Sequence, residues 1–329
     1  MEGTGFKDRF RVEGGKAEHC RLVLAPIRGI TDCLYRSLIQ RHFGGFDLAL
    51  APFINPQGYK KIQDKHLRDV LAENNRQLPV VPQLLHTGSR DFIHTAGRLA
   101  ELGHDHINWN LGCPAPMVVK KKRGSGLLPY PETICRFLDE VCPAISQQLS
   151  IKTRLGLHAE DELLHLLPLL NDYPLKEITI HCRLGEQLYR GEANPDGFER
   201  CLNLSRHELI YNGDIDCQKT FSALQARFPM VSKWMIGRGA LGHPDLAAEL
   251  KGSTLSPEER LERLQKFHDD LFETYTRRLS GQSHILGRMK QIWSYMIHSF
   301  PGKEKQLKRI KKATGMERYR KAVDELFKG

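Results

Sequence analysis

The chain of 329 residues lacks several features that would place it in a familiar class. It has no run of about 18 apolar residues, so we expect no transmembrane helix. The first 20 residues are charged and contain no apolar segment, which argues against a secretory signal. The eight cysteines include no Cys-x-x-Cys pair, so we predict neither a metal site nor a compact disulfide framework. Together these absences favour a reduced, cytoplasmic protein.

The composition is that of an ordinary globular protein, with 40% hydrophobic and 27% charged residues. Its net charge of +10 is unevenly distributed. Residues 251–329 contain 18 Lys and Arg against 10 Asp and Glu, a net charge of +8, and residues 1–250 contribute only +2. A basic end of this kind indicates either a polyanionic partner or a solvated helical face.

Short β-rich runs alternate with longer segments of helical period. Strands are predicted at 22–26, 47–51, 80–84, 106–110, 150–154, 177–181, 209–212 and 233–236. Helices are predicted at 32–41, 91–102, 131–147, 161–170 and 217–226. This alternation favours an α/β fold, the (β/α)8 TIM barrel. The alternative is a doubly wound open sheet, but the Gly-x-Gly-x-x-Gly turn typical of that fold does not follow the first strand.

The segment 250–257 is typical of a linker. Ser256 can cap a following helix that has Pro257 at its first position. The pattern beyond it is helical, with breaks at 299–302 and 314–315. We therefore predict an N-terminal extension at 1–20, a catalytic barrel at 21–252 and a small C-terminal helical domain at 253–329.

Cys113 stands directly after the fourth predicted strand, on a tight loop between Gly112 and Pro114. Active sites of such barrels lie at the carboxyl ends of the strands, so a thiol there would stand over a bound cofactor. The alternative is a small, buried and inert cysteine.

Other predicted strands also end in polar residues. Lys152 lies in an apolar strand, where a lysine is costly unless it meets an anion or a polar ring. It could stabilise a reduced flavin, form a Schiff base or simply reach solvent. His181 and Arg183 alternate along one strand and therefore share a face. Gln83 and Asn110 suit the edge of a flat heterocycle, or they could be buried amides that tie the barrel together.

The last two strands end in glycine-containing turns, Asn212-Gly213-Asp214 and Gly237-Arg238-Gly239. Exposed backbone N–H groups beside an arginine form an anion pocket. Loops after the seventh and eighth strands are the usual phosphate site of this architecture, so the pair predicts a bound phosphate group.

These residues together resemble the tRNA-dihydrouridine synthases, from about Leu22 to the end of the helical domain. The motifs that carry the resemblance are, in order, Leu24-Ala25-Pro26-x-x-Gly29-x-Thr31-Asp32, Asn110-x-Gly112-Cys113-Pro114, Gly124-x-Gly126-x-Leu128, Lys152-Thr153-Arg154-Leu155-Gly156, His181-x-Arg183, Glu186-Gln187-x-Tyr189-x-Gly191, Asn212-Gly213-Asp214-Ile215, Ile236-Gly237-Arg238-Gly239-Ala240-Leu241 and Arg288-Met289-Lys290-Gln291. Some positions depart from the usual pattern. Ile27 replaces a common Met, and Arg28 adds a charge near the barrel mouth. Leu184-Gly185 replaces a more usual Thr-containing pair, and Asn194-Pro195 ends a segment that often closes on Trp.

The resemblance implies a flavin mononucleotide (FMN) across the barrel mouth. The residues that it assigns to the cofactor are Ala25, Pro26, Ile27, Gln83, Lys152, His181, Asn212, Gly213, Asp214, Gly237 and Arg238. It also implies that Asn110 orients the substrate base and that Arg183 lies beside the flavin and the uracil.

The implied reaction is the FMN-dependent reduction of a specific uridine in tRNA to 5,6-dihydrouridine, with NADPH as reductant. Hydride would pass from flavin N5 to C6, and Cys113 would donate a proton to C5 as general acid. A monomer would bind tRNA through its helical domain, with phosphate contacts from Lys305, Lys308, Arg309 and Lys312. Arg288 and Lys290 could face the cleft between the domains and also contact the tRNA.

Two other functions fit parts of the sequence. A small-molecule flavin dehydrogenase of the dihydropyrimidine or dihydroorotate type would share the barrel and the cysteine, but it does not need a basic helical domain. A non-catalytic RNA-binding barrel would need the charge but not Cys113, Lys152 and His181.

Overall fold

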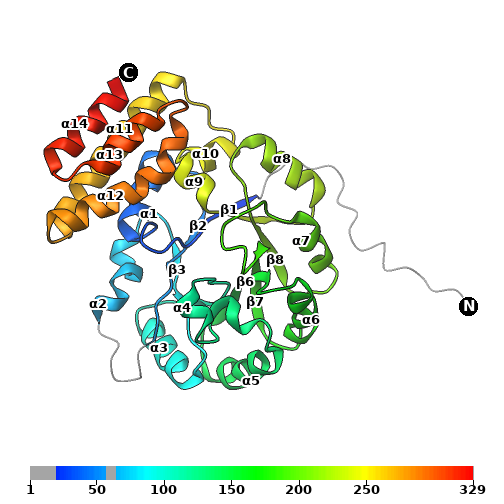
Figure 1. The fold of residues 1–329 in the computed structure, drawn as a ribbon. Coiled ribbons are helices and arrows are strands. Elements are labelled where there is room, and N and C mark those ends of the chain that lie inside the picture. The colour runs from blue at the N-terminus through cyan, green and yellow to red at the C-terminus, as the bar shows by residue number, and fades with distance from the viewer. Residues whose placement is uncertain (1–19, 57–63, 329) are drawn as a thin grey trace, which may run out of the picture.

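The computed structural model describes residues 20–56 and 64–328. The strands are β1 Arg21–Leu24, β2 Leu48–Leu50, β3 Val80–Val81, β4 Gln83–Leu84, β5 His106–Leu111, β6 Gln148–Gly156, β7 Leu175–Leu184, β8 Glu208–Asn212 and β9 Lys233–Ile236. They form one parallel sheet in the order β3-β2-β1-β9-β8-β7-β6-β5-β4. The predicted barrel is confirmed (Figure 1), and the open doubly wound sheet is excluded.

The sheet closes through the third predicted strand, which is divided at Pro82. Its first half, β3, pairs with β2, and its second half, β4, pairs with β5. Pro82 has no N–H to donate, but its carbonyl accepts from the Asn108 N–H at 2.9 Å. Eight predicted strands therefore become nine short ones around the same ring.

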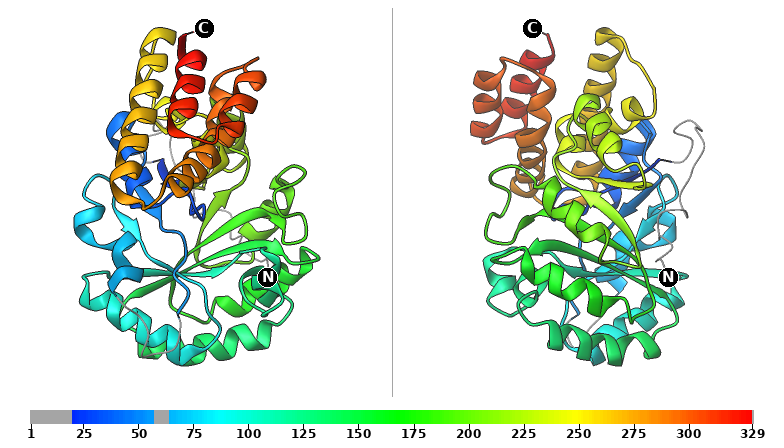
Figure 2. Two further views of the ribbon diagram at one scale, coloured as in Figure 1. Left: turned by 60° about the vertical axis from the view of Figure 1, so that its left-hand side comes forward. Right: turned by 90° about the vertical axis from the view of Figure 1, so that its right-hand side faces the viewer.

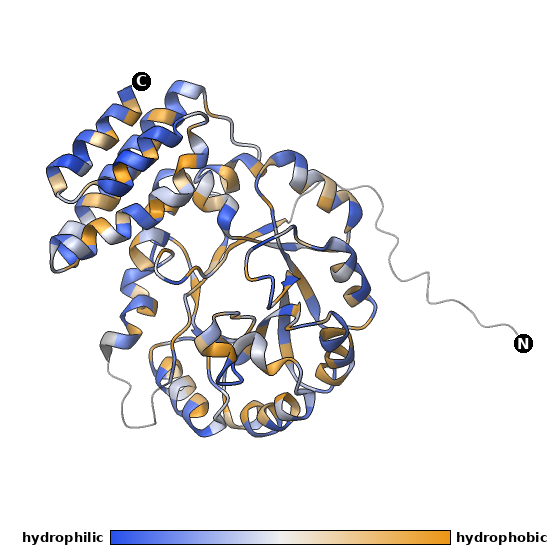
Figure 3. Cartoon of the chain, in the orientation of Figure 1, coloured by the Kyte–Doolittle hydropathy of each residue, from blue (hydrophilic) through white to orange (hydrophobic). Residues whose placement is uncertain are grey.

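The helices of the barrel part follow its strands, and most of them lie outside the ring. They are α1 Cys33–His42, α2 Asp64–Leu67, α3 Ser89–Glu101, α4 Pro116–Val119, α5 Pro131–Val141, α6 Asp161–Leu170, α7 Pro195–Leu202, α8 Gln218–Arg227, α9 Arg238–Gly242 and α10 Leu246–Leu250. They carry both hydrophobic and hydrophilic residues (Figure 3), as helices that cover a core must. In α5 the buried positions are Ile134, Phe137, Leu138 and Val141.

The predicted helix 131–147 is too long. α5 ends at Val141 and continues only as a 3-10 turn over Cys142–Ala144, because Pro143 cannot continue an α-helix. The short helices α2, α4, α7, α9 and α10 were not predicted, since so few residues show no clear period. Of the predicted extension 1–20, only Cys20 lies within the described residues.

The C-terminal helices are α11 Pro257–Arg278, α12 Gln282–Met296, α13 Glu304–Lys312 and α14 Met316–Lys328. The predicted cap at Ser256 is confirmed as a capping box with Glu259. These helices gather on one side of the barrel (Figure 2), where α11 contacts α1 and α12 contacts α9. Among the described residues, no helix has the length and apolar character needed to cross a membrane.

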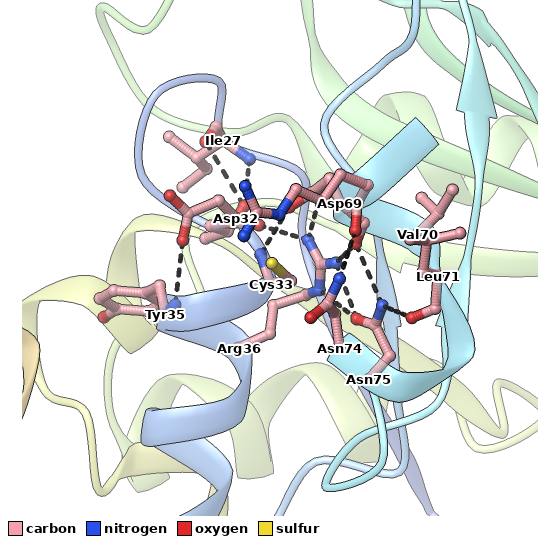
Figure 4. A network of polar contacts seen from close by, with 12 residues as sticks. Ile27, Asp32, Cys33, Tyr35, Arg36, Asp69, Val70, Leu71, Asn74 and Asn75 are labelled. Atoms are coloured by element: carbon pink, nitrogen blue, oxygen red, sulfur yellow. Dashed lines mark hydrogen bonds and ion pairs between the residues drawn. The ribbon is translucent and has the colours of Figure 1, made fainter. Parts of the chain in front are cut away.

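A buried polar network braces the loop that follows β1 (Figure 4). The Arg36 side chain is 1% exposed, and its Nη1 donates to the Asp69 carboxylate at 2.9 Å and to the Thr31 carbonyl at 2.7 Å. Its Nη2 donates to Asn75 Oδ1 at 2.8 Å. The Thr31 hydroxyl in turn accepts from the Ile27 N–H at 2.8 Å.

The helical domain holds the same loop from the opposite side. Arg288 donates to the Gly29 carbonyl and lies 3.7 Å from the Asp32 carboxylate. The Tyr275 hydroxyl donates to Asp32 Oδ1 at 2.9 Å, and the Arg288 guanidinium lies 5.5 Å from the Tyr275 ring centroid. The β1 loop is therefore fixed by both parts of the molecule.

Replacing Arg36 by Met tests the network. We expect the free energy of unfolding to fall by roughly 3 kcal/mol, the low end for a broken buried pair, because the Asp69 carboxylate keeps some contact with water. Urea unfolding measures the change. The matched control is Arg41→Met at an exposed position of the same helix, and equal stability of the two variants would contradict the role given to Arg36.

Candidate active site

A cavity of about 790 Å³ opens at the carboxyl ends of the strands. Its wall contains every residue that the sequence assigned to the cofactor, together with Cys113, Asn110 and Arg183. The helical domain closes one side with Ser294, Tyr295 and His298. The volume lies within the range of pockets that hold a cofactor-sized molecule.

Cys113 lies on the rim of this cavity, on the loop between β5 and α4. Burial raises the pKa of the Cys113 thiol, although the Ala115 N–H and the charges of Arg154, Arg28 and Lys152 act in the opposite direction. The thiol is therefore protonated at neutral pH. Gly124 packs directly against this loop: a Cβ there would lie 2.5 Å from the Cys113 carbonyl oxygen, and its φ of +56° also favours glycine.

Asn110 holds the Cys113 loop in place. Its Oδ1 accepts from the Cys113 N–H at 2.9 Å and from the Gly112 N–H at 3.1 Å. Its Nδ2 donates to Gln83 Oε1 at 2.8 Å, and Gln83 Nε2 donates to Asn108 Oδ1 at 2.8 Å. Asn110 and Gln83 thus tie neighbouring strands together at the cavity wall, one of the two roles that the sequence left open.

Lys152 extends from β6 toward β8, where its Nζ donates to Asn212 Oδ1 at 2.8 Å. Asn212 is oriented by its own donation to the Met235 carbonyl at 2.8 Å. Burial, reinforced by the charge of Arg154, lowers the pKa of Lys152 to about 7. An anion that enters the cavity would therefore stabilise the charged form of Lys152.

His181 and Arg183 extend from β7, as their alternation predicted. Burial and the charges of Lys152 and Arg154 hold the pKa of His181 well below its ordinary value, so the ring is neutral. Its Nε2 accepts from Arg183 Nη1 at 3.3 Å. Arg183 is 1% exposed and also binds the Gly191 carbonyl at 2.7 Å and the Asp214 carboxylate.

Asp214 joins two arginines at the far end of the cavity. Arg238 Nη2 donates to Asp214 Oδ1 at 2.8 Å, and the Ala193 N–H donates to Oδ2 at 2.8 Å. Burial acts to raise the pKa of Asp214, but the hydrogen bond from Arg183 and these further contacts hold it below its ordinary value. The carboxylate therefore fixes Arg238 beside the glycine turn, where an anionic group can bind.

Arg154 and Tyr189 are among the cavity residues that were not assigned a role from the sequence. Arg154 lies two positions after Lys152 on β6, and its Nε donates to the Gly112 carbonyl at 3.0 Å. The Tyr189 ring lies 5.3 Å from the Arg154 guanidinium and 5.7 Å from that of Arg238. The strand alternation from Lys152 could have identified Arg154, and Tyr189 stands in the motif at 186–191, although no role was assigned to it there.

Arg28, for which the sequence offered no explanation, lies on the cavity rim with its guanidinium 5.3 Å from the Phe53 ring centroid. The cations of the helical domain that the sequence assigned to tRNA binding do not line the cavity. Arg288 is engaged with the β1 loop, and Lys290 donates to the Ala313 carbonyl. Lys305, Lys308, Arg309 and Lys312 are exposed on α13, where Arg309 pairs with Glu325 at 2.8 Å.

Within 20–56 and 64–328, no group of three or more His, Cys, Asp or Glu side chains is arranged to hold a metal ion.

The low pKa of Lys152 gives the ligand-free protein a defined pH dependence. Folded Lys152 loses its proton near pH 7, whereas the unfolded chain keeps it to about 10.5. The unfolded state binds more protons between these values, so Lys152 makes the free energy of unfolding rise with pH across this window. Urea unfolding at pH 7, 8 and 9 should show that the free energy of unfolding rises less steeply with pH in Lys152→Met than in the unaltered protein. The exposed Lys219→Met is the control, and identical pH slopes in all three proteins would contradict a lowered pKa at Lys152.

Comparison with known proteins supports the family resemblance that the sequence motifs indicated. A family model described as dihydrouridine synthase matches residues 23–328. The tRNA-dihydrouridine synthase B of Vibrio vulnificus is 29% identical over 255 residues, covering 74% of this chain and 76% of that protein. A probable tRNA-dihydrouridine synthase of Staphylococcus aureus is 28% identical over 278 residues, covering 82% and 83%.

Solved structures agree on the architecture. Morphinone reductase aligns with a TM-score of 0.51 at 15% identity, covering 73% of this chain and 88% of its own. The old yellow enzyme homologue of Zymomonas mobilis aligns with a TM-score of 0.51 at 11% identity, covering 73% and 92%. At such identities the likeness shows the barrel fold alone. The match of the family model over nearly the whole described chain shows that this protein belongs to the dihydrouridine synthase family.

Proposed function

We propose that this protein reduces a uridine of tRNA to 5,6-dihydrouridine, with FMN in the barrel cavity and NADPH as its reductant. The observation that carries the proposal is the protonated Cys113 thiol on the rim of a cavity lined by cations. Family membership and the names of the relatives support the same conclusion.

The cavity fits FMN in shape and in charge. Ala25, Pro26 and Ile27 offer an apolar surface to a flat ring, and Lys152 and His181 offer polar groups to its edge. Arg238 and the glycine turns suit the phosphate. At Gly239 a Cβ would lie 2.0 Å from the Ile215 carbonyl oxygen, so this turn can approach the loop after β8 only with glycine. When bound, the flavin supplies the hydride chemistry.

Cys113 acts as the general acid. Because burial raises the pKa of its thiol, Sγ carries a proton at neutral pH and can donate it to C5 of uracil. The charges of Arg154, Arg28 and Lys152 favour the thiolate that remains after donation. The same cations stabilise the negative charge that develops on the uracil C4 carbonyl.

The neighbours of Cys113 position it and the base. Asn110 fixes the thiol by accepting two N–H bonds from its loop, and one Nδ2 hydrogen remains for the substrate. Arg183 is largely engaged with Asp214 and the Gly191 carbonyl, so it acts mainly by holding Arg238 and the 190–191 loop. Arg154 and Tyr189 are the additional groups that we assign to the base.

The base of the substrate uridine must swing out of its stacked position in the folded tRNA to reach this cavity, and the lost stacking costs free energy. We assign the helical domain, 253–329, to tRNA binding, with phosphate contacts from Lys305, Lys308, Arg309 and Lys312. Arg288 and Lys290 remain candidates through their unused N–H groups. We further propose that the enzyme acts as a monomer in the cytoplasm.

Removing the thiol tests the chemistry. Cys113→Ala should keep the visible spectrum of bound flavin yet form dihydrouridine at least about 100-fold more slowly, the usual loss when a general acid is removed. Mass spectrometry of the tRNA product measures the rate. Cys217→Ala, at an exposed cysteine, is the control. An undiminished rate of dihydrouridine formation in Cys113→Ala would show that Cys113 is not the general acid.

The charge of α13 gives a separate prediction. Replacing Lys305, Lys308 and Lys312 by Gln in the full chain should raise the Kd for tRNA. It should also reduce the slope of log Kd against log salt by about one for each lost phosphate contact. A slope equal to that of the unaltered protein would show that this charge is only a solvated face.

Two other functions predict different results. A small-molecule flavin dehydrogenase would reduce free uracil as well as it reduces unmodified tRNA. A non-catalytic RNA-binding protein would bind tRNA but show no flavin absorbance. Cys113, Lys152 and His181 in one cavity argue against the non-catalytic RNA-binding protein. The exposed cations of α13, which a small-molecule dehydrogenase does not need, favour the tRNA enzyme over that alternative.

A further inference from the structure

The segment that follows Cys113 carries a charge that no carboxylate of the described residues balances. No acidic residue occurs in the sequence between Asp105 and Glu132, and four consecutive cations stand at 120–123. Among the residues that the structure describes, no carboxylate lies within ion-pair distance of these four side chains. In the helical domain, by contrast, Arg260 pairs with Asp245 at 2.6 Å and Arg309 with Glu325 at 2.8 Å.

The segment lies beside the cavity. Cys113, Pro114 and Ala115 line the cavity, and α4 begins at the next residue, Pro116. Figure 1 shows α4 in front of the strands rather than among the outer helices. This helix and the turn that follows it therefore lie beside the cavity that a base of the RNA would enter.

The two C-terminal cations of the segment are fixed to the barrel. Arg123 Nη1 donates to Asn55 Oδ1 at 3.1 Å, and Nη2 donates to His86 Nε2 at 2.8 Å. Lys122, whose φ is +50°, places its Nζ 4.2 Å from the Tyr130 ring centroid. A non-glycine residue in this conformation needs support from its surroundings, and these contacts supply it.

Three other side chains of the segment face solvent. Lys120 and Lys121 are exposed, and Met117 is 79% exposed, the largest value among the exposed large hydrophobic residues of the described chain. An exposed thioether between a cavity and two exposed ammonium groups is unusual for a surface that binds nothing. It combines an apolar contact for a base or sugar with charges for phosphates.

We propose that residues 116–123 form a tRNA-binding strip on the barrel rim, in which Lys120 and Lys121 bind backbone phosphates and Met117 packs against the nucleotide that flanks the extruded uridine. The strip would contact the RNA beside the cavity, independently of α13. This inference rests on the proposed function, because it names tRNA as the partner of the same site.

The test compares two charge-matched double variants of the flavin-loaded full chain. Lys120→Gln/Lys121→Gln removes the two exposed cations of the strip. Lys176→Gln/Arg206→Gln removes two exposed cations at the amino ends of β7 and β8, at the end of the barrel opposite the cavity. Unmodified tRNA transcript is the probe, and both its Kd over a salt series and the kinetics of dihydrouridine formation are measured.

Lys120→Gln/Lys121→Gln should raise Kd and KM for tRNA roughly tenfold near 100 mM salt and reduce the salt slope by about two, one for each phosphate contact. Its kcat and flavin spectrum should stay unchanged. The control should stay within about twofold of the unaltered protein, because random surface charges do not touch the RNA.

Met117→Gln should raise Kd roughly fivefold with an unchanged salt slope, as expected when an apolar contact is lost and no charge is removed. An unchanged Kd in this variant would overturn the part of the proposal that concerns the thioether.

The outcomes separate this inference from the proposed function. Equal Kd and salt slope in the strip variant and the control would overturn the strip even if dihydrouridine forms normally. A protein that forms no dihydrouridine contradicts the proposed function, but its Kd values still test the strip. A protein with no affinity for tRNA would overturn both.

Discussion

The constraint on which the site depends is an excess of positive charge inside one cavity. Arg28, Lys152, Arg154, Arg183 and Arg238 all line it, and Asp214 is the carboxylate that contacts two of them. Burying cations without partners is costly, and the pKa of Lys152 falls to about 7 as a result. Such an arrangement is stable only because backbone carbonyls accept from the arginines, and it gains further from a bound anion. The wall of the cavity is thus built for an anionic ligand before any ligand arrives.

Around this charge the barrel holds its reactive group through amides rather than through ion pairs. Asn110, Gln83 and Asn108 form a hydrogen-bonded chain across β4 and β5, and the chain ends on the Cys113 loop. Neutral amides fix geometry without adding charge, so the thiol keeps its proton while cations stand close by. These neutral hydrogen bonds hold the Cys113 loop in place without lowering the pKa of the thiol, which burial raises.

The helical domain is joined to the cavity through the β1 loop. Arg288 and Tyr275 bind Gly29 and Asp32 of that loop from one side, while Arg36 and Asp69 brace it from the other. Ile27, on the same loop, faces the cavity. A residue that the sequence suggested for tRNA binding, Arg288, is thus also part of the connection between the two parts of the chain. Sequence reasoning could not foresee this, because Gly29 and Arg288 are 259 positions apart.

The sequence by itself determined the barrel and the residues that meet at its mouth. Alternating β and helical periods identified all the strand regions, and the rule that chemistry gathers at strand carboxyl ends brought Cys113, Lys152 and His181 together. These features are local or follow from topology, so one chain is enough to reveal them. The tertiary structure alone decided how each side chain uses its hydrogen bonds. It divided the third strand at Pro82, added Tyr189 to the cavity, turned Asn110 toward the Cys113 loop and left Lys120 and Lys121 exposed. Partners, burial and charge balance depend on contacts between distant segments, and no pattern within one segment contains that information.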